Sequence, residues 1–209
     1  MTGGSATSPT GPEEKPYLAA PVSERFEDRH ISPYSTREKV GRMLWAMVQA
    51  TLFRCSFHTW YGWRRFLLRR FGARLHDTAA VRRTVRVECP WNLAMGRNSS
   101  LGDFVIAYCL GPVTIGDRVS VSQYSHLCAG SHDYTKPNMP LLRPPITIGD
   151  DVWIAADAFV GPGVEVGAGA VLGARAVAMK RLKPWTVYLG NPAQPVRPRT
   201  PFETGGAGA

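Results

Sequence analysis

The sequence has no cysteine framework and no long hydrophobic run. Its four cysteines, Cys55, Cys89, Cys109 and Cys128, are far apart and include no CxxC pair. In a chain of 209 residues this spacing is typical of reduced thiols rather than of a disulfide-stapled secreted domain. The longest apolar stretch, residues 43–53, has 11 residues and is too short to cross a bilayer. We therefore expect a cytoplasmic protein.

Acidic residues are scarce in one segment. Residues 54–86 contain nine arginines and a single acid, Asp77, so they carry +8 of the formal net charge of +9. The rest of the chain is nearly neutral, which argues against a polyanion partner for the whole molecule. No nucleic-acid recognition motif accompanies the arginines, and we expect no nucleic-acid partner. Residues 1–16 are polar and lack the apolar core of a signal peptide.

Composition divides the chain into four parts. Residues 1–34 and 198–209 have the polar, Gly- and Pro-containing composition of a flexible leader and a flexible tail. Residues 35–75 predict a basic helical extension, and residues 76–197 predict a repeat domain.

The extension predicts two helices. The first covers residues 37–53, with Ser35 or Thr36 as its N-cap, and the second covers about residues 59–71 and ends before Gly72. The second is a basic amphipathic helix. Its apolar side carries Trp60, Trp63, Leu67 and Phe71, and its charged surface carries Arg64, Arg65, Arg69 and Arg70. Such a helix docks on an anionic membrane, or it packs on the repeat domain as a cap with its arginines in solvent. The sequence leaves both interpretations open.

The repeat domain is defined by a period of six residues. Every sixth position is aliphatic along one run: Ile148, Ile154, Val160, Val166, Leu172 and Ala178. A Gly or Ala follows each of the first five, and a small apolar residue lies four positions after each. The pattern recurs upstream from Met95, with one slip between Ala107 and Ile115. A period of six predicts an all-β solenoid, a parallel β-helix with three hexapeptides in each triangular coil.

The repeat is interrupted once, at residues 133–145. This segment contains Pro137, Pro140, Pro144 and Pro145, and it directly follows His132. A long insertion in a solenoid forms an excursion from one face, and that face is often the functional one.

Three motifs accompany the repeat: GlySerHisAspTyr at 130–134, ProIleThrIleGlyAspAspValTrpIleAla at 145–155 and GlyAsnProAla at 190–193. With them, the chain resembles the hexapeptide-repeat acyltransferases over roughly residues 35–197. ProTrpAsn at 90–92 and the basic, Trp-rich extension are similar to the colanic acid biosynthesis O-acetyltransferase branch. The resemblance implies a left-handed coil, an exception to the usual right-handed crossover. It also implies a homotrimer that binds acetyl-CoA between adjacent β-helices.

His132 matches the catalytic histidine of that family. A neutral imidazole, with a pKa near ~6.5, suits removal of a proton from an attacking hydroxyl. Asp133 is a candidate to orient it or to bind the acceptor, and the resemblance makes Asp103 and Tyr108 candidates for acceptor binding. His126, one hexapeptide before His132, either lines the acceptor cleft or is merely exposed. A histidine-bound zinc needs a third ligand, whereas the hexapeptides contain only His126 and His132 and His76 lies before them, so we expect no metal.

The resemblance also implies a set of cofactor-binding residues. Small residues would leave a groove for pantetheine beside an indole, and basic residues would reach the phosphates of coenzyme A. The matching positions are Trp153, Ala155, Ala156, Gly173, Ala174, Lys180 and Arg197. Gln194 departs from the family pattern, because a basic residue is expected there.

The sequence therefore predicts an acetyl-CoA-dependent O-acetyltransferase. Its acceptor would be a sugar hydroxyl of a cell-surface polysaccharide precursor, either free or lipid-linked, with peripheral association at the inner face of the membrane. Two alternatives stay open: acetylation of another small hydroxylated acceptor, and a non-catalytic β-helix scaffold whose basic extension binds a partner.

Overall fold

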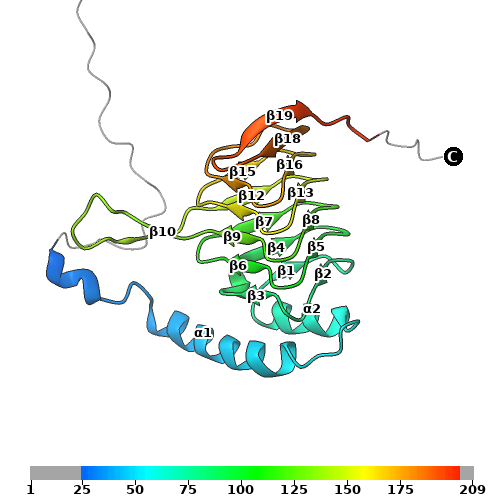
Figure 1. Ribbon diagram of the computed structural model, residues 1–209. Helices are drawn as coiled ribbons and strands as arrows, with labels where there is room; N and C mark the ends of the chain where they lie inside the picture. Colours follow the sequence, from blue (N-terminus) through cyan, green and yellow to red (C-terminus); the bar gives the residue numbers. More distant parts are fainter. Residues whose placement is uncertain (1–24, 203–209) are drawn as a thin grey trace, which may run out of the picture.

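The computed structural model describes residues 25–202 and shows a column of stacked coils with helices at its N-terminal end (Figure 1). Most of the predicted leader and tail, residues 1–24 and 203–209, lies outside this range. A 3-10 helix, η1, covers Phe26–His30, and Arg199 donates Nη1 hydrogen bonds to the carbonyls of Asp151 and Gly169.

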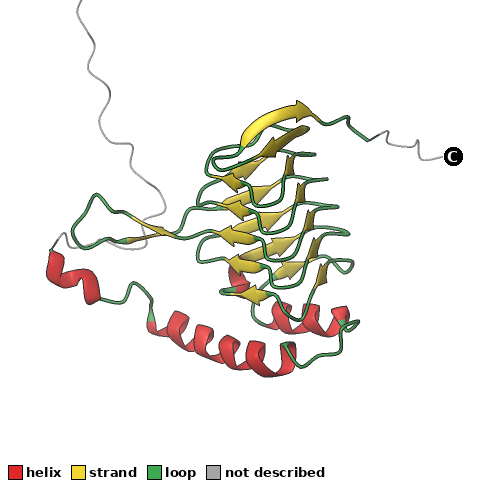
Figure 2. Ribbon diagram, in the orientation of Figure 1, coloured by secondary structure: helices red, strands yellow, loops and turns green. Residues whose placement is uncertain are grey.

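Short strands form three parallel sheets, one on each face of the column (Figure 2). The first sheet contains β1 (Arg74–Leu75), β4 (Leu93–Met95), β7 (Val113–Ile115), β12 (Ile146–Ile148) and β15 (Glu165–Val166). The second contains β2 (Ala80–Val81), β5 (Ser100–Leu101), β8 (Ser120–Val121), β13 (Trp153–Ile154), β16 (Val171–Leu172), β18 (Thr186–Leu189) and the antiparallel β19 (Gln194–Pro198). The third contains β3 (Arg86–Val87), β6 (Ile106–Tyr108), β9 (His126–Cys128), β14 (Phe159–Val160) and β17 (Val177–Ala178). The prediction of a left-handed parallel β-helix is confirmed.

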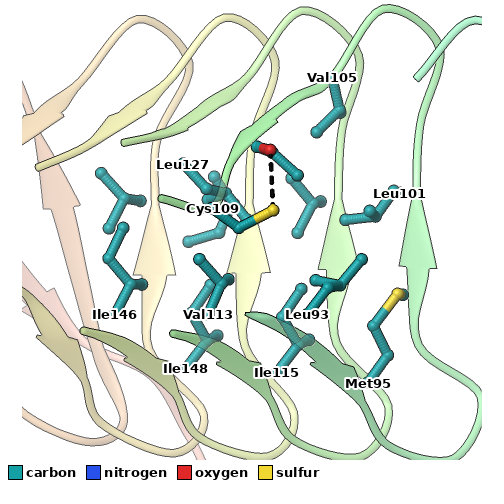
Figure 3. Close-up of a cluster of buried hydrophobic side chains, with 14 of the residues drawn as sticks. Leu93, Met95, Leu101, Val105, Cys109, Val113, Ile115, Leu127, Ile146 and Ile148 are labelled. Carbon is teal, nitrogen blue, oxygen red and sulfur yellow. Dashed lines mark hydrogen bonds between the residues drawn. The ribbon is translucent and has the colours of Figure 1, made fainter. Parts of the chain in front are cut away.

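The period of six arises because one residue of each hexapeptide fills the interior. All six aliphatic residues from Ile148 to Ala178 are buried, and like residues stack from coil to coil, as Met95, Ile115 and Ile148 do (Figure 3). Where a glycine follows the aliphatic residue in the middle coils, a larger residue would collide with the neighbouring coil. A Cβ on Gly116 would collide with Oδ1 of Asp150, which accepts a hydrogen bond from the Asp117 amide.

The slip in the repeat comes from longer coils at the N-terminal end. Strand partners are 20 residues apart there, as between Ala94 and Thr114, and 18 apart later, as between Trp153 and Val171. The extra residues lie at the corner between the third and first sheets. One such corner holds the 3-10 helix η3 (Pro90–Asn92). The first coil begins at Arg74, upstream of Met95, where the period of six begins in the sequence.

Two α-helices close the N-terminal end of the column (Figure 1). The first, α1, covers Thr36–Val48 and continues as a π-helical turn, η2, at Gln49–Phe53; the second, α2, covers Tyr61–Arg70. Ser35 is the N-cap of α1, since its side chain accepts a hydrogen bond from the Glu38 amide. The helices therefore form a cap on the first coil.

The cap donates hydrogen bonds to carbonyl groups of the first coil, which has no preceding coil to pair with. Strands β1, β2 and β3 are the edges of their sheets, and an unpaired edge carbonyl needs a donor. Arg69 donates to the carbonyl of Leu75, Arg64 to that of Val81, and the indole of Trp45 to that of Val87.

The prediction that Arg64 lies on the surface is wrong. Its side chain is fully buried, and it donates hydrogen bonds to Ser56 Oγ and to the carbonyls of Val81, Phe57 and His58 at 2.6–2.9 Å. A guanidinium has five donors in a fixed fork, so one side chain serves several acceptors that would otherwise be buried and unsatisfied. Burial lowers its pKa below the ordinary arginine value.

We expect Arg64→Ala to lower the free energy of unfolding by about 3 kcal/mol or more, because it orphans several buried acceptors. Denaturant titration followed by circular dichroism measures the change. Arg70→Ala, an exposed arginine of the same helix, is the control and should change stability by less than about 0.5 kcal/mol. Equal effects of the two substitutions would contradict this role of Arg64.

Candidate functional site

The interruption at 133–145 is a hairpin that leaves the corner between the third and first sheets (Figure 1). Strand β10 (Ser131–His132) pairs antiparallel with β11 (Leu141–Leu142), and His132 lies opposite Leu141. The hairpin takes His132 out of the column, so its side chain is exposed to solvent.

One contact determines the tautomer of His132. Its Nδ1 lies 2.7 Å from the carbonyl oxygen of Met139, and a carbonyl only accepts hydrogen bonds. Nδ1 must therefore carry the proton, and Nε2 of the neutral ring is left as the acceptor. Met139 itself has a left-handed backbone, with φ of 45°. The sequence could not predict the contribution of Met139, because every residue has a backbone carbonyl and the residue type does not show which carbonyl will accept a hydrogen bond.

Asp133, the candidate to orient His132, is tied to the hairpin turn. Its carboxylate is buried and accepts hydrogen bonds from the amide and the hydroxyl of Thr135. Its own amide donates to the carbonyl of Pro140. These bonds give Asp133 a part in shaping the hairpin that carries His132.

The extension also holds the base of this hairpin. Arg143 forms a two-contact ion pair with Glu38 of α1, at 3.0 and 3.2 Å. The Tyr34 ring contacts two guanidinium groups, with its centroid 4.2 Å from Cζ of Arg42 and 5.2 Å from Cζ of Arg143. Arg42 in turn pairs with Glu88 of the first coil. These residues were not singled out in the sequence, because 105 positions separate Glu38 from Arg143.

Tyr108 and His126 lie together on the third face, near the start of the hairpin. Their rings meet edge to face at 6.2 Å, and Phe159 contacts His126 from the other side at 5.2 Å. Burial, helped by the charge of Arg86, lowers the pKa of His126, and burial raises the pKa of Tyr108. Both shifts favour the neutral forms of these two side chains. Tyr108 also packs below Gly130, where a Cβ would be 3.0 Å from the phenol ring.

Asp103 lies at a different corner, between the second and third sheets. It accepts a hydrogen bond from Thr84 Oγ1 at 2.7 Å and is 3.7 Å from the Arg82 guanidinium. A cleft of about 440 Å³ opens there, and Tyr61 and Tyr124 are among its lining residues. Within one chain a strand of the third face separates Asp103 from His132, a span of at least ~10 Å for three residues.

The small cofactor-binding candidates share the corner that holds Asp103. Ala155 and Ala156 lie there on one coil, and Gly173 and Ala174 lie on the next. Trp153 is on the adjacent second face, 47% exposed, and its indole donates to Ser122 Oγ at 3.0 Å. Because Ser122 also lines the 440 Å³ cleft, Trp153 borders the cleft of Asp103.

The basic candidates are elsewhere, at the C-terminal end of the column. Lys180 and Arg197 both line a cavity of about 650 Å³, together with Gln194. Lys180 follows β17 at the corner that also holds His132, two coils further along. Within a single chain the cofactor candidates thus form two groups: Trp153 with the small corner residues, and Lys180 with Arg197 at the C-terminal end.

We expect Glu38→Gln to loosen the hairpin, because it removes the charge partner of Arg143. Charge-assisted pairs of this kind contribute about 1–2 kcal/mol, so protection of residues 131–142 against amide hydrogen exchange should fall roughly tenfold. Glu165→Gln, which removes an exposed pair with Arg181, is the control and should leave the hairpin unchanged. Unaltered exchange in Glu38→Gln would show that the ion pair does not hold the hairpin.

The described residues form a solenoid of hexapeptides with a histidine-bearing excursion, and known proteins share its sequence and fold. The model of the family "Bacterial transferase hexapeptide (six repeats)" matches residues 145–177. The chain is 44% identical over 160 residues to WcaF of Escherichia coli (strain K12), which is named for acetyl transfer in colanic acid biosynthesis. That alignment covers 77% of this chain and 88% of WcaF. The chain belongs to the hexapeptide-repeat acetyltransferase family, and it is an acyltransferase of that class.

Solved structures share the fold. A hexapeptide-repeat acetyltransferase of Vibrio cholerae, determined with acetyl coenzyme A, has a TM-score of 0.71 and 25% identity, with 86% of this chain and 100% of that chain covered. A maltose O-acetyltransferase of Clostridium difficile 630 also has a TM-score of 0.71, at 24% identity, with 80% and 90% covered.

The described residues contain no helix that is both long and apolar enough to span a membrane. Within the same range, no three His, Cys, Asp or Glu side chains converge as a metal site would require.

Proposed function

We propose that this protein transfers the acetyl group of acetyl-CoA to a sugar hydroxyl of a cell-surface polysaccharide precursor. The observation that carries the proposal is the environment of His132: an exposed imidazole whose Nδ1 is held by the Met139 carbonyl, which leaves Nε2 to accept a proton. The name of WcaF supports a polysaccharide acceptor, and the acetyl-CoA complex of the Vibrio cholerae enzyme supports the donor.

The reaction needs a base and a good leaving group. Nε2 of His132 takes the proton of the acceptor hydroxyl as its oxygen attacks the thioester carbonyl carbon. The new C–O bond forms, the C–S bond breaks, and the departing thiolate takes the proton from the imidazolium. No net proton is gained or lost, and His132 returns to its starting state.

The split of the candidate residues between two corners supports a homotrimer. His132 and Lys180 lie at one corner of the column, whereas Asp103 and the small residues, among them Ala155, lie at the other. A groove between adjacent copies brings the first corner of one copy to the second corner of its neighbour. In that groove Asp103, Tyr108 and His126 contact the acceptor.

The same groove would hold the donor in two parts. The pantetheine arm lies beside Trp153 and along the small corner residues, whose lack of side-chain bulk exposes backbone amides. Lys180 and Arg197 contact the phosphates of coenzyme A, for which two cations are suited.

We expect His132→Ala to lower kcat by about 10²–10⁴-fold, the usual contribution of a general base. Release of free thiol from acetyl-CoA in the presence of an acceptor glycan measures the rate. His58→Asn, an exposed histidine of the cap, is the control and should keep the wild-type rate. Wild-type turnover in His132→Ala would exclude His132 as the base.

We expect Lys180→Ala and Arg197→Ala each to raise the KM for acetyl-CoA by about tenfold, the effect of losing one charge-assisted phosphate contact. The matched control is a second donor, acetyl-pantetheine, which has no phosphates. Its KM should be the same for both variants and the wild-type protein. Equal losses with the two donors would show that these cations do not bind phosphate.

Peripheral association with the membrane is part of the proposal, but not through the four arginines first considered. Arg64 is buried, and Arg65 and Arg69 donate to the edge carbonyls of Ala79 and Leu75. Only Arg70 of that group is left without a hydrogen bond or ion pair in the described range. A membrane contact must use a different part of the cap.

A further inference from the structure

One side of α1 is apolar and exposed. Val40, Met43, Leu44 and Met47 are spaced i, i+3, i+4 and i+7, and each is 47–62% exposed. The opposite side carries Trp45, which is buried against the first coil. A helix at the surface of a globular protein normally presents polar residues to solvent, so this arrangement is reversed.

The rest of the cap also exposes apolar residues. Trp63 and Phe66 of α2 are 38% and 51% exposed beside the buried Leu67 and Leu68, and their rings stack at 5.7 Å. The Trp63 indole donates to the Leu52 carbonyl at 3.1 Å, which joins α2 to the end of α1. We call this surface the basal face; its exposed residues are Val40, Met43, Leu44, Met47, Leu52, Phe57, Trp60, Trp63 and Phe66.

The two helices that carry the basal face are basic, and we call their exposed cations its rim. Residues 39–76 contain eight lysines and arginines and no acidic residue. Four exposed cations of the two helices and their connection, Arg37, Lys39, Arg54 and Arg70, make no ion pair within the described residues. An apolar centre with aromatic residues and a basic rim matches the interface of an anionic bilayer, in which apolar side chains enter the acyl boundary and cations contact headgroups.

We propose that the basal face docks on a lipid surface with anionic headgroups. A second copy of this chain is a poor occupant, because face-to-face pairing would bring two rings of like charge together. The hairpin of His132 is tied to α1 through Glu38 and Arg143, so docking would also fix the position of this hairpin relative to the membrane. Given the proposed acetyl transfer, an acceptor anchored in lipid would then be the favoured substrate.

Vesicle flotation tests the apolar part of the face, and it needs no enzymatic activity. The full-length protein should float with vesicles of phosphatidylcholine and phosphatidylglycerol at 7:3. Met47→Ser with Phe66→Ser, at 62% and 51% exposure, should reduce the bound fraction at least about tenfold. Val196→Ser with Phe202→Ser, at 52% and 56% exposure near the C-terminal end, is the matched control and should bind as the wild type does.

A pair of charge variants tests the rim. Arg54→Gln with Arg70→Gln should weaken binding about tenfold or more, since each cation near an anionic surface contributes about a fivefold factor. Arg97→Gln with Arg175→Gln removes the same charge from corners of the column and should have little effect. Binding should also fall with added salt and be weak on pure phosphatidylcholine.

Two results would overturn the proposal. The first is a wild-type protein that binds neither kind of vesicle. The second is a change of oligomeric state, measured by sedimentation without lipid, when Met47→Ser and Phe66→Ser are introduced, because the face would then be a contact between copies. Either result leaves acetyl transfer to be judged separately by the thiol-release assay.

Discussion

The structure depends on closing the open edge of a stack of parallel strands. Each coil hydrogen-bonds to the next, so only the first coil has carbonyls with no strand beneath them. The helical cap provides the missing donors, most directly through Trp45, Arg64 and Arg69. Part of the arginine concentration at 54–86 is therefore structural, and Arg64 in particular replaces the backbone amides that a further coil would have supplied.

The cap also links stability to the candidate site. The ion pair between Glu38 and Arg143 joins α1 to the hairpin, and Met139 of that hairpin holds the His132 ring. A residue of the extension thus contributes to the position of His132, the proposed base, at the hairpin that leaves the middle of the column. Helix α1 therefore has three surfaces with distinct roles. Trp45 packs on the first coil, Glu38 holds the hairpin, and a third side belongs to the basal face.

The fold could be predicted because each inner position of a coil has the same environment. An aliphatic residue is required at every sixth position, and the repetition makes the requirement visible without any long-range information. The 20-residue coils were harder to recognise, since their longer corners break the period. His132 could be predicted from its motif and its place before the proline-rich segment. The residues that hold the hairpin could not, because Tyr34 and Glu38 carry no pattern of their own.

The sequence alone determined the β-helix, its interruption and the histidine at the start of it, because periodicity and insertion are local properties of the chain. Tertiary structure decided which arginines face water. It buried Arg64 and left an apolar side of α1 exposed, since Arg64 and Trp45 donate to unpaired carbonyls of the first coil and so fix which sides of the two helices face it. It also separated Asp103 from His132 within one chain, because the three-sided coil sends successive hexapeptides to different corners.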